Sequence, residues 1–254
     1  MKNRLFNFLV LMLFLSCSKD KNNQLLGPGI ILSTDVPPPM WYDLKDYLKA
    51  NGVKITFYTQ GYQLMDSAGK AQTRLLIADG HELAHHTTTH LHADDFLSSH
   101  SIDEYMQQEI YNMDALMQKD GFTTTTFAYP YGDFTNKSDE YLLKRFKNIR
   151  KIISPYAYRK IEDTDQVYYR YKGVKVFYAC SIDKKEKYPV EEILDALDKA
   201  KSSRSALSMY CHMISKGEPE LNTVYALDFA DLDRIIQRAN KLGLKYYRAC
   251  DLTE

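Results

Sequence analysis

The sequence predicts an α/β protein built as an irregular (β/α) barrel of about seven units. Short apolar runs rich in β-branched residues alternate with amphipathic segments almost to the C-terminus. Strands separated by helices pair in parallel, and a parallel sheet of about seven units can close into a barrel. Asp35, His86 and His212 each directly follow a predicted strand. Barrels of this class carry their reactive side chains at the C-terminal ends of the strands.

Each predicted element has a local reason. Helical spacing of apolar residues is clearest in the segment 102–119, where Ile102, Met106, Ile110, Met113 and Met117 recur on one face. The predicted strands cover residues 30–34, 53–58, 82–85, 124–128, 149–153, 206–211 and 244–248. The predicted helices cover residues 42–51, 70–78, 102–119, 137–147, 191–201 and 228–242, and glycines end several of them.

The segment 167–182 differs from the rest. It is rich in Tyr and Val, and no helical pattern separates its two halves around Gly173. This composition predicts a hairpin-like excursion from the barrel.

Composition excludes some classes of protein. Lys plus Arg and Asp plus Glu both number 33, so no excess of positive charge favours a nucleic acid as partner. Four cysteines in 254 residues are too few for a disulfide scaffold. The length beyond residue 27 is sufficient for one substantial domain.

The N-terminus predicts a secretory signal. Lys2 and Arg4 precede an apolar run at residues 5–15, which is shorter than the ~20 residues that a membrane-spanning helix needs. Ser16 and Cys17 follow, in a pattern that looks like a bacterial lipobox. We therefore expect a signal peptide over 1–16, a lipidated Cys17 with a polar tether over 17–26, and a catalytic-type domain over 27–254. This arrangement implies a lipid anchor in a bacterial cell envelope, with the domain facing the periplasm or the cell exterior.

Six of the seven histidines lie between His81 and His100, which predicts a metal site because neutral imidazole is a common ligand of divalent ions. One arrangement is His81-Glu82-x-x-His85, the HExxH pattern of zinc proteases, which must lie on a helix. Here it follows a turn and runs into three threonines, which are poor helix formers. The other arrangement, which the pattern favours, is His86-Thr-Thr-Thr-His90.

Four motifs together resemble the polysaccharide deacetylase family, also called the NodB-homology or carbohydrate esterase family four. That family has H-[ST]-x-x-H preceded by G-H-E, as in residues 80–90 here. Residues 32–37 (LSTDVP) are similar to its first motif, and residues 127–132 (FAYPYG) to its third. Residues 207–212 are similar to the strand that ends in its second catalytic residue. The resemblance covers nearly all of 27–254 and implies a NodB-like barrel.

The resemblance also implies roles for individual residues. A divalent ion, zinc by preference, would be held by His86 and His90, and Asp35 would accept the proton of a bound water. His212 would protonate the leaving amine, and the backbone N–H of Tyr131 would stabilise the oxyanion. Tyr129, Pro130 and Trp41 would contact the substrate, although Trp41 could equally be a packing residue.

Two departures from the family pattern leave alternatives open. The family has two adjacent aspartates, a base and a metal ligand, and Val36 stands in the second place. Either the ion has lost a ligand, in which case Val36→Asp should tighten metal binding, or Asp35 itself ligates the ion. Ala128 stands where many members carry an arginine that orients the base. The fourth motif, expected near 181–188, is not identifiable.

These residues predict a metal-dependent hydrolase that removes N-acetyl groups from an amino-sugar polymer, glycan or peptidoglycan. A catalytically degenerate lipoprotein that binds glycans is the alternative that Val36 and Ala128 favour. An amidase or O-deacetylase would use the same site, because nothing in the sequence identifies the leaving group.

Overall fold

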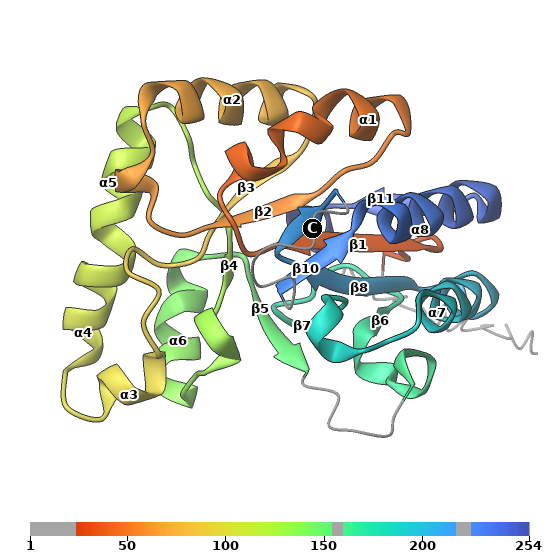
Figure 1. The fold of residues 1–254 in the computed structure, drawn as a ribbon. Coiled ribbons are helices and arrows are strands. Elements are labelled where there is room, and N and C mark those ends of the chain that lie inside the picture. The colour runs from red at the N-terminus through yellow and green to blue at the C-terminus, as the bar shows by residue number, and fades with distance from the viewer. Residues whose placement is uncertain (1–23, 154–159, 217–224, 254) are drawn as a thin grey trace, which may run out of the picture.

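The computed structural model describes residues 24–153, 160–216 and 225–253, and a closed barrel of parallel strands lies at its centre (Figure 1). Strands β1 and β8 pair in parallel along their whole length and close the barrel. The expected (β/α) barrel of seven units is confirmed. Its strands, in spatial order, are β1 (Gly29–Thr34), β2 (Thr56–Thr59), β3 (Glu82–His85), β4 (Thr126–Ala128), β5 (Asn148–Ile153), β7 (Val176–Ser181) and β8 (Ala206–Cys211).

The barrel is irregular between β1 and β2. Strand β2 pairs only with Ser33 and Thr34, and β11 (Lys245–Tyr247) pairs in parallel with the first half of β1. Gly29 permits this approach, since a Cβ at that position would lie 2.5 Å from the carbonyl oxygen of Lys245. The last strand of the chain therefore fills the wedge that β2 leaves open.

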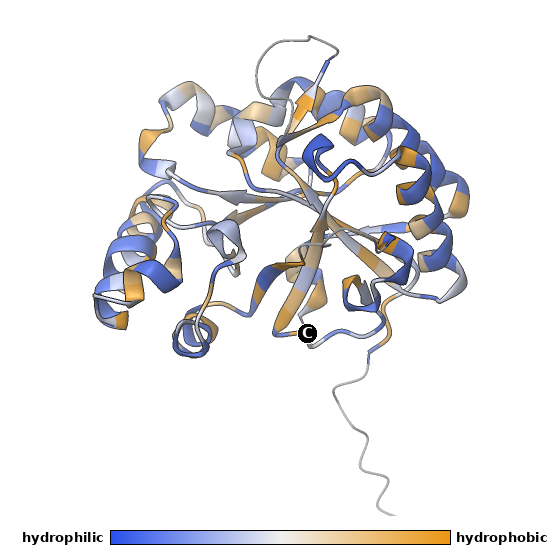
Figure 2. Cartoon of the chain, turned by 60° about the horizontal axis from the view of Figure 1, so that its bottom comes forward, coloured by the Kyte–Doolittle hydropathy of each residue, from blue (hydrophilic) through white to orange (hydrophobic). Residues whose placement is uncertain are grey.

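Helices surround the barrel and bury one face each. In α8 (Phe229–Leu242) the buried residues Leu232, Ile235, Ile236 and Ala239 follow helical spacing, and Gly243 ends the helix in a left-handed conformation. Figure 2 shows the mixture of hydrophilic and hydrophobic residues along these outer helices. The other α-helices are α1 (Lys45–Ala50), α2 (Ser67–Ala78), α3 (Ala93–Leu97), α4 (Ile102–Tyr105), α5 (Asn112–Lys119), α6 (Asn136–Arg145) and α7 (Val190–Ser202). Within the described ranges, no helix is long and apolar enough to cross a membrane.

The predicted helix 102–119 is present, but it is not regular. Between α4 and α5 the segment Met106–Tyr111 forms a π-helical turn. Such a turn rotates the side chains that follow it relative to a regular helix, and it is frequent at functional sites. Here it carries the buried Glu109.

The expected hairpin over 167–182 is wrong. Strand β6 (Tyr168–Tyr169) pairs antiparallel with β8, whereas β7 is a barrel strand that lies parallel between β5 and β8. The Tyr169 hydroxyl accepts a hydrogen bond from the backbone N–H of Tyr178, so the two segments touch without forming a ladder. The physical reason is closure: without β7 in the gap, β5 and β8 would each expose an unpaired edge.

The residues just before position 27 already contact the barrel. Leu26 is buried and donates its backbone N–H to Arg170, and Leu25 forms a bridge with Tyr171. The end of the expected tether is thus attached to the barrel. The expected signal peptide and Cys17 lie outside the described residues. The described cysteines, Cys180, Cys211 and Cys250, are free thiols.

Candidate active site

The C-terminal ends of the barrel strands bring the predicted residues to one rim. Asp35 follows Thr34 at the end of β1, and His212 follows Cys211 at the end of β8. Thr34 and Cys211 are register partners, and the Thr34 hydroxyl donates to the carbonyl oxygen of His212 at 2.8 Å. Residues that are 177 positions apart in the chain therefore leave adjacent strands at the same level.

Asp35 is a buried carboxylate with a charged partner. Its Oδ2 accepts a hydrogen bond from Nη2 of Arg150 at 2.7 Å and lies 3.9 Å from Nε2 of His86. Its Oδ1 is buried without a hydrogen-bond partner among the described residues. Burial alone would raise the pKa of Asp35, but the charge of Arg150, with smaller contributions from His86 and His212, outweighs it. The pKa therefore lies below its ordinary value, and the carboxylate is ionised at neutral pH.

His86 is completely buried and has a defined tautomer. Its Nδ1 lies 2.8 Å from the carbonyl oxygen of Ala128, which can only accept, so Nδ1 carries the proton. Burial lowers the pKa of His86 to about 3, and the ring is neutral. The lone pair of Nε2 consequently faces the carboxylate of Asp35.

His90 is carried by a loop with an unusual backbone. Thr87 and His90 both have left-handed φ angles, 68° and 61°, although neither is glycine. Glu109 holds this loop: its carboxylate accepts from the backbone N–H and the hydroxyl of Thr89, and its carbonyl oxygen accepts from the N–H of Thr88. The His90 ring lies 5.0 Å from that of His86, centroid to centroid. Its pKa is lowered, chiefly by burial.

His212 is held by Asp183. The carboxylate of Asp183, itself buried, accepts from the backbone N–H of His212 at 3.0 Å and lies 2.7 Å from its Nδ1. Burial alone would lower the pKa of His212, but the hydrogen bond to Asp183 and the charges of Asp35 and Asp183 outweigh it, so the pKa is raised. A protonated imidazole of this kind can donate a proton to a leaving group.

Tyr131 lies against His90, with ring centroids 4.6 Å apart. Its side chain is 51% exposed, its φ angle is 57°, and its ring stacks on that of His92 with centroids 3.7 Å apart. Gly132 follows with φ 80°, and a Cβ there would overlap the side chain of Ile152. The Pro-Tyr-Gly turn is therefore a packed element that fixes the backbone of Tyr131 at the rim.

Trp41 and Tyr129, two of the residues expected to contact substrate, pack in the interior of the described structure. Both side chains are completely buried. The indole N–H of Trp41 donates to the carbonyl oxygen of His212 at 2.8 Å, and this hydrogen bond helps to fix the backbone of His212. The hydroxyl of Tyr129 donates to the carboxylate of Asp139 at 2.9 Å and lies 2.9 Å from the hydroxyl of Ser138. Pro130 is also buried, beneath the turn that presents Tyr131.

The sequence interpretation missed Arg150 and Asp183. Arg150 is the register partner of Ala128 on the neighbouring strand, so a guanidinium reaches Asp35 although position 128 carries none. The one sequence feature that could have pointed to Arg150 was the presence of a charged residue within a predicted apolar strand. Asp183 follows β7, the strand that was taken for half of a hairpin. Had β7 been placed in the barrel, the rule that selected Asp35 and His212 would have selected Asp183.

His81 and His85 do not form a protease site. The segment that contains Glu82 and His85 is strand β3, not a helix. Nδ1 of His81 accepts from the backbone N–H of Ile55, and Nδ1 of His85 accepts from that of Thr87. Burial lowers the pKa of His81 to about 4 and that of His85 to about 3, which fits neutral, structural side chains.

The donor set fits a zinc-type ion. A buried carboxylate oxygen and a neutral imidazole nitrogen face each other at 3.9 Å, which is too long for a hydrogen bond. Zinc ligands of these types bind at ~2.0–2.2 Å, so this separation suits two ligands of one ion. Val36 is buried in the apolar core beside this pair. Among the described residues, His92, Asp94 and Asp95 form a group of three with ligand atoms within 4.8 Å of one another. The two aspartates are exposed, and His92 already contacts Asp133.

A comparison of sequences supports the family resemblance. Residues 29–146 match the model of the polysaccharide deacetylase family. This stretch contains Asp35, His86, His90 and the Pro-Tyr-Gly turn. Over these residues the chain is similar to a polysaccharide deacetylase domain. His212 and Asp183 lie beyond the matched residues, and the barrel topology brings them to the same rim.

Similar proteins agree with this resemblance. The chain is similar to chitin deacetylase 1 of Cryptococcus neoformans, with 28% identity over 103 residues. That match spans 41% of this chain and only 21% of the relative.

Solved structures share the fold. The chitin deacetylase of the fungal pathogen Colletotrichum lindemuthianum superposes with a TM-score of 0.59 at 16% identity, over 91% of this chain and 89% of the other. A carbohydrate esterase family four pseudoenzyme from Bacillus anthracis superposes with a TM-score of 0.56 at 13% identity, over 90% and 66% of the two chains.

Proposed function

We propose that this protein is a metal-dependent hydrolase that removes N-acetyl groups from an amino-sugar polymer. The observation that carries the proposal is the pairing at the rim: an ionised carboxylate held by Arg150 and an imidazole held by Asp183. Two titratable groups whose surroundings push their pKa values in opposite directions from their ordinary values are the usual arrangement of a base and an acid. Similarity to the polysaccharide deacetylase family supports the same chemistry.

In this proposal Asp35 has two tasks, and each of the other residues has one. Asp35 and His86 would hold the ion, and His90 would approach it from the loop that Glu109 fixes. A bound divalent ion supplies a water of lowered pKa and polarises the acetamide carbonyl. The carboxylate of Asp35 takes up the proton of the attacking water through the oxygen that has no partner in the described structure. The backbone N–H of Tyr131 stabilises the oxyanion, and His212 protonates the departing amine.

The test is acetate release from acetylated chito-oligosaccharides, with and without a chelator. Asp35→Asn should abolish release because an amide does not accept a proton at neutral pH. Asp165→Asn is the matched control, since Asp165 is an exposed aspartate that pairs with Lys199 on α7. Equal rates in Asp35→Asn and the control would remove Asp35 from the mechanism.

A glycan-binding protein without turnover is the second candidate, and Val36 is the observation that favours it. An apolar side chain stands beside Asp35 where a second carboxylate would be needed for a fuller ligand set. The pseudoenzyme from Bacillus anthracis has the same fold, although the likeness extends to fold alone. Glycan binding without acetate release, in protein purified free of metal, would establish this candidate. Chelator-sensitive release would exclude it.

We also propose that the protein is anchored in a bacterial cell envelope by a lipid on Cys17. The apolar run at residues 5–15 and the Ser16-Cys17 junction support this proposal. Metabolic labelling with a fatty acid should mark the wild-type protein and leave Cys17→Ser unlabelled. Labelling of both proteins would place the lipid elsewhere.

A further inference from the structure

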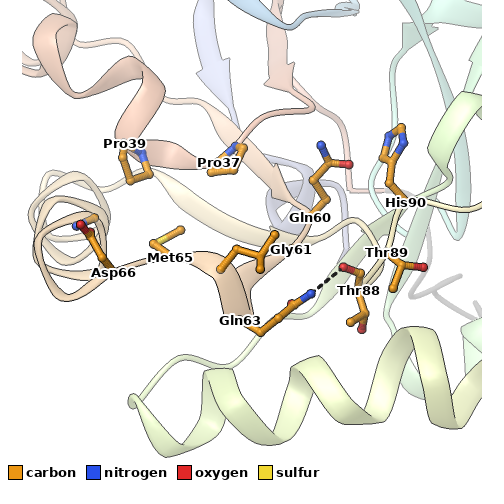
Figure 3. Close-up of a pocket in the computed structure, with 12 residues that line it drawn as sticks. Pro37, Pro39, Gln60, Gly61, Gln63, Met65, Asp66, Thr88, Thr89 and His90 are labelled. Carbon is orange, nitrogen blue, oxygen red and sulfur yellow. Dashed lines mark hydrogen bonds between the residues drawn. The ribbon is translucent and has the colours of Figure 1, made fainter.

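Hollows lie at both ends of the barrel. One, of about 710 Å³, opens beside His90 at the rim and belongs to the candidate active site (Figure 3). Another, of about 420 Å³, lies at the N-terminal ends of β5 and β7, which we call the floor. Lys147 and Lys175 line it and directly precede these two strands. Since β5 and β7 have six residues each, the floor lies about 20 Å from the rim.

The floor pocket is basic. Within the described structure, four of its nine lining residues are Lys or Arg and none is Asp or Glu. Lys144 and Arg145 already pair with carboxylates. Lys147 and Lys175 are exposed, and neither side chain has an ion-pair or hydrogen-bond partner among the described residues. Two cations of the floor can therefore meet an anion outside the chain.

Two large apolar side chains are exposed on the same surface. Leu25 is 65% exposed and Tyr171 is 47% exposed, and the two residues form an antiparallel bridge. Arg170 and Lys172 flank Tyr171, and Gly173 after them already lines the floor pocket. An exposed aliphatic side chain, a tyrosine and several cations together are typical of a surface that meets a membrane, where aromatic rings lie at the level of the headgroups.

A bilayer fits this surface better than two other occupants. A small anion would pair with the lysines but leave Leu25 and Tyr171 in water. A second copy of the chain in a symmetric contact would place the same lysines against each other, because such a contact joins identical patches. Anionic lipids attract each lysine near the membrane surface, and long cationic side chains can lie along apolar surface while their charge stays at the headgroups.

The point where the chain enters the barrel also indicates a bilayer. The carbonyl oxygen of Gln24 accepts from the backbone N–H of Lys172, so the first described residue lies on this surface. A lipid on Cys17, as proposed above, would be seven residues away from Gln24. A fully extended chain of that length spans at most ~25 Å. The anchor would therefore keep the floor within reach of the membrane surface.

We propose that the floor patch docks on the surface of an anionic lipid bilayer. This patch consists of Leu25, Lys147, Tyr171, Lys172 and Lys175. Its apolar side chains enter the headgroup region, and its lysines contact lipid phosphates. The candidate active site, at the opposite end of the barrel, then faces away from the membrane and toward polymer outside it. The inference goes beyond the proposed hydrolase and relies on the proposed lipid anchor only for the short tether.

A tryptophan placed in the patch reports contact with lipid. The chain has one tryptophan, Trp41, which is completely buried. Tyr171→Trp adds a second one in the patch. Tyr111→Trp is the matched control, since Tyr111 is 45% exposed and lies on the π-helical turn that supports the loop of His90 at the rim.

Each full-length protein is incubated with two kinds of vesicle. One is phosphatidylcholine, and the other is equal parts phosphatidylcholine and phosphatidylglycerol. Both contain a brominated lipid that quenches nearby tryptophan. Tyr171→Trp should be quenched severalfold more by the anionic vesicles than by the neutral ones, and severalfold more than Tyr111→Trp. Equal quenching of the two variants by anionic vesicles, or equal quenching of Tyr171→Trp by both kinds of vesicle, would overturn the proposal.

Lysine variants in the Tyr171→Trp protein test the role of charge. Lys175→Gln should raise the anionic lipid concentration at half-maximal quenching by about fivefold, whereas Lys175→Arg should leave it nearly unchanged. Lys137→Gln is the matched control, because Lys137 is exposed in the first turn of α6, at the opposite end of that helix from the floor pocket. An equal effect of Lys175→Gln and Lys137→Gln would contradict docking through the patch.

The outcomes separate this proposal from the others. Acetate release does not enter the measurement, so loss of the proposed activity leaves the result intact. If the proteins do not sediment with neutral vesicles, the lipid anchor fails, and quenching by anionic vesicles then decides on the patch by itself. A blue shift of the Tyr171→Trp emission that grows with protein concentration without lipid would assign the patch to a second copy and overturn the proposal.

Discussion

Arg150 illustrates how a single buried residue supports this site. Its guanidinium is completely buried, pairs with Asp35, and lies 4.9 Å and 4.4 Å from the ring centroids of Tyr58 and Tyr210. Its Nε and Nη1 have no hydrogen-bond partner among the described residues. A buried ion pair contributes little net stability while it is intact, but removing one partner leaves an uncompensated charge.

We therefore expect Arg150→Met to lower the free energy of unfolding by about 3–5 kcal/mol in urea at pH 7. The exposed pair of Arg234 with Glu191 provides the control, and Arg234→Met should change it by less than about 1 kcal/mol. Adding Asp35→Asn to Arg150→Met should restore part of the loss. If it does not, the loss comes from packing rather than from the stranded carboxylate.

A substitution of Val36 distinguishes the two arrangements that the sequence left open, a metal ion that lacks one ligand or a metal ion that Asp35 itself ligates. The structure places its side chain in the apolar core and directs Asp35 itself toward Nε2 of His86. We therefore expect Val36→Asp to leave zinc affinity unchanged or weaker and to reduce stability, because a carboxylate would enter apolar surroundings. Zinc titration of both proteins checks this, and clearly tighter binding in the variant would show that a ligand was missing.

Asp183 controls the protonation of His212. Since its hydrogen bond and charge keep the pKa of His212 above the ordinary value, Asp183→Asn should lower that pKa. If His212 must be protonated, the alkaline limb of the kcat/KM profile should move to lower pH. Asp165→Asn, at an aspartate that is 91% exposed, should not move it. An unchanged alkaline limb in Asp183→Asn would assign that limb to another group.

At the scale of an element, the π-helical turn Met106–Tyr111 has a clear task. It presents Glu109 to the loop of His90, where one carboxylate satisfies two donors of Thr89. The left-handed residues Thr87 and His90 need such support, because their backbone conformations are unfavourable for side chains with a Cβ.

Glu109→Ala should consequently weaken metal binding by about 10–100-fold, as is typical when a group that orients ligands is lost. Gln108→Ala is the control, because Gln108 is the exposed neighbour on the same turn. Calorimetric titration with zinc measures both variants. Equal affinities would mean that the loop keeps its shape without Glu109.

At the scale of the whole molecule, Glu82 joins the barrel floor to the C-terminal turn. Its carboxylate accepts from the hydroxyls of Thr56 and Thr126 and from the backbone N–H of Cys250. Burial raises the pKa of Glu82, although these hydrogen bonds oppose the rise. The folded state therefore binds a proton more tightly than the unfolded state at this position.

The sign of the pH effect follows from linkage. A carboxyl group whose folded pKa is raised destabilises the fold as the pH rises from the unfolded pKa, ~4.3, through the folded pKa. Glu82→Gln cannot ionise, so it should be at least as stable as the wild type at pH 7, with the difference vanishing at pH 4. Urea unfolding at the two pH values checks this. Lower stability of the variant at both values would mean that the hydrogen bonds outweigh the ionisation.

The sequence by itself determined the fold class, the family resemblance and the positions of Asp35, His86, His90 and His212 at strand ends. Those conclusions depend on local properties: apolar periodicity, turn residues and the spacing of histidines along a few residues of chain. A short motif is readable because its members are covalent neighbours.

Only the tertiary structure decided which partners these residues have. Arg150 reaches Asp35 because of the register between β4 and β5, and Asp183 reaches His212 because β7 lies beside β8 rather than in a hairpin. Trp41 and Tyr129 have aromatic rings of the kind that stack on sugars, but both side chains are buried in the interior. Strand register and burial depend on contacts between segments that are distant in the sequence, so a local sequence pattern does not predict them. These contacts form together when the barrel closes.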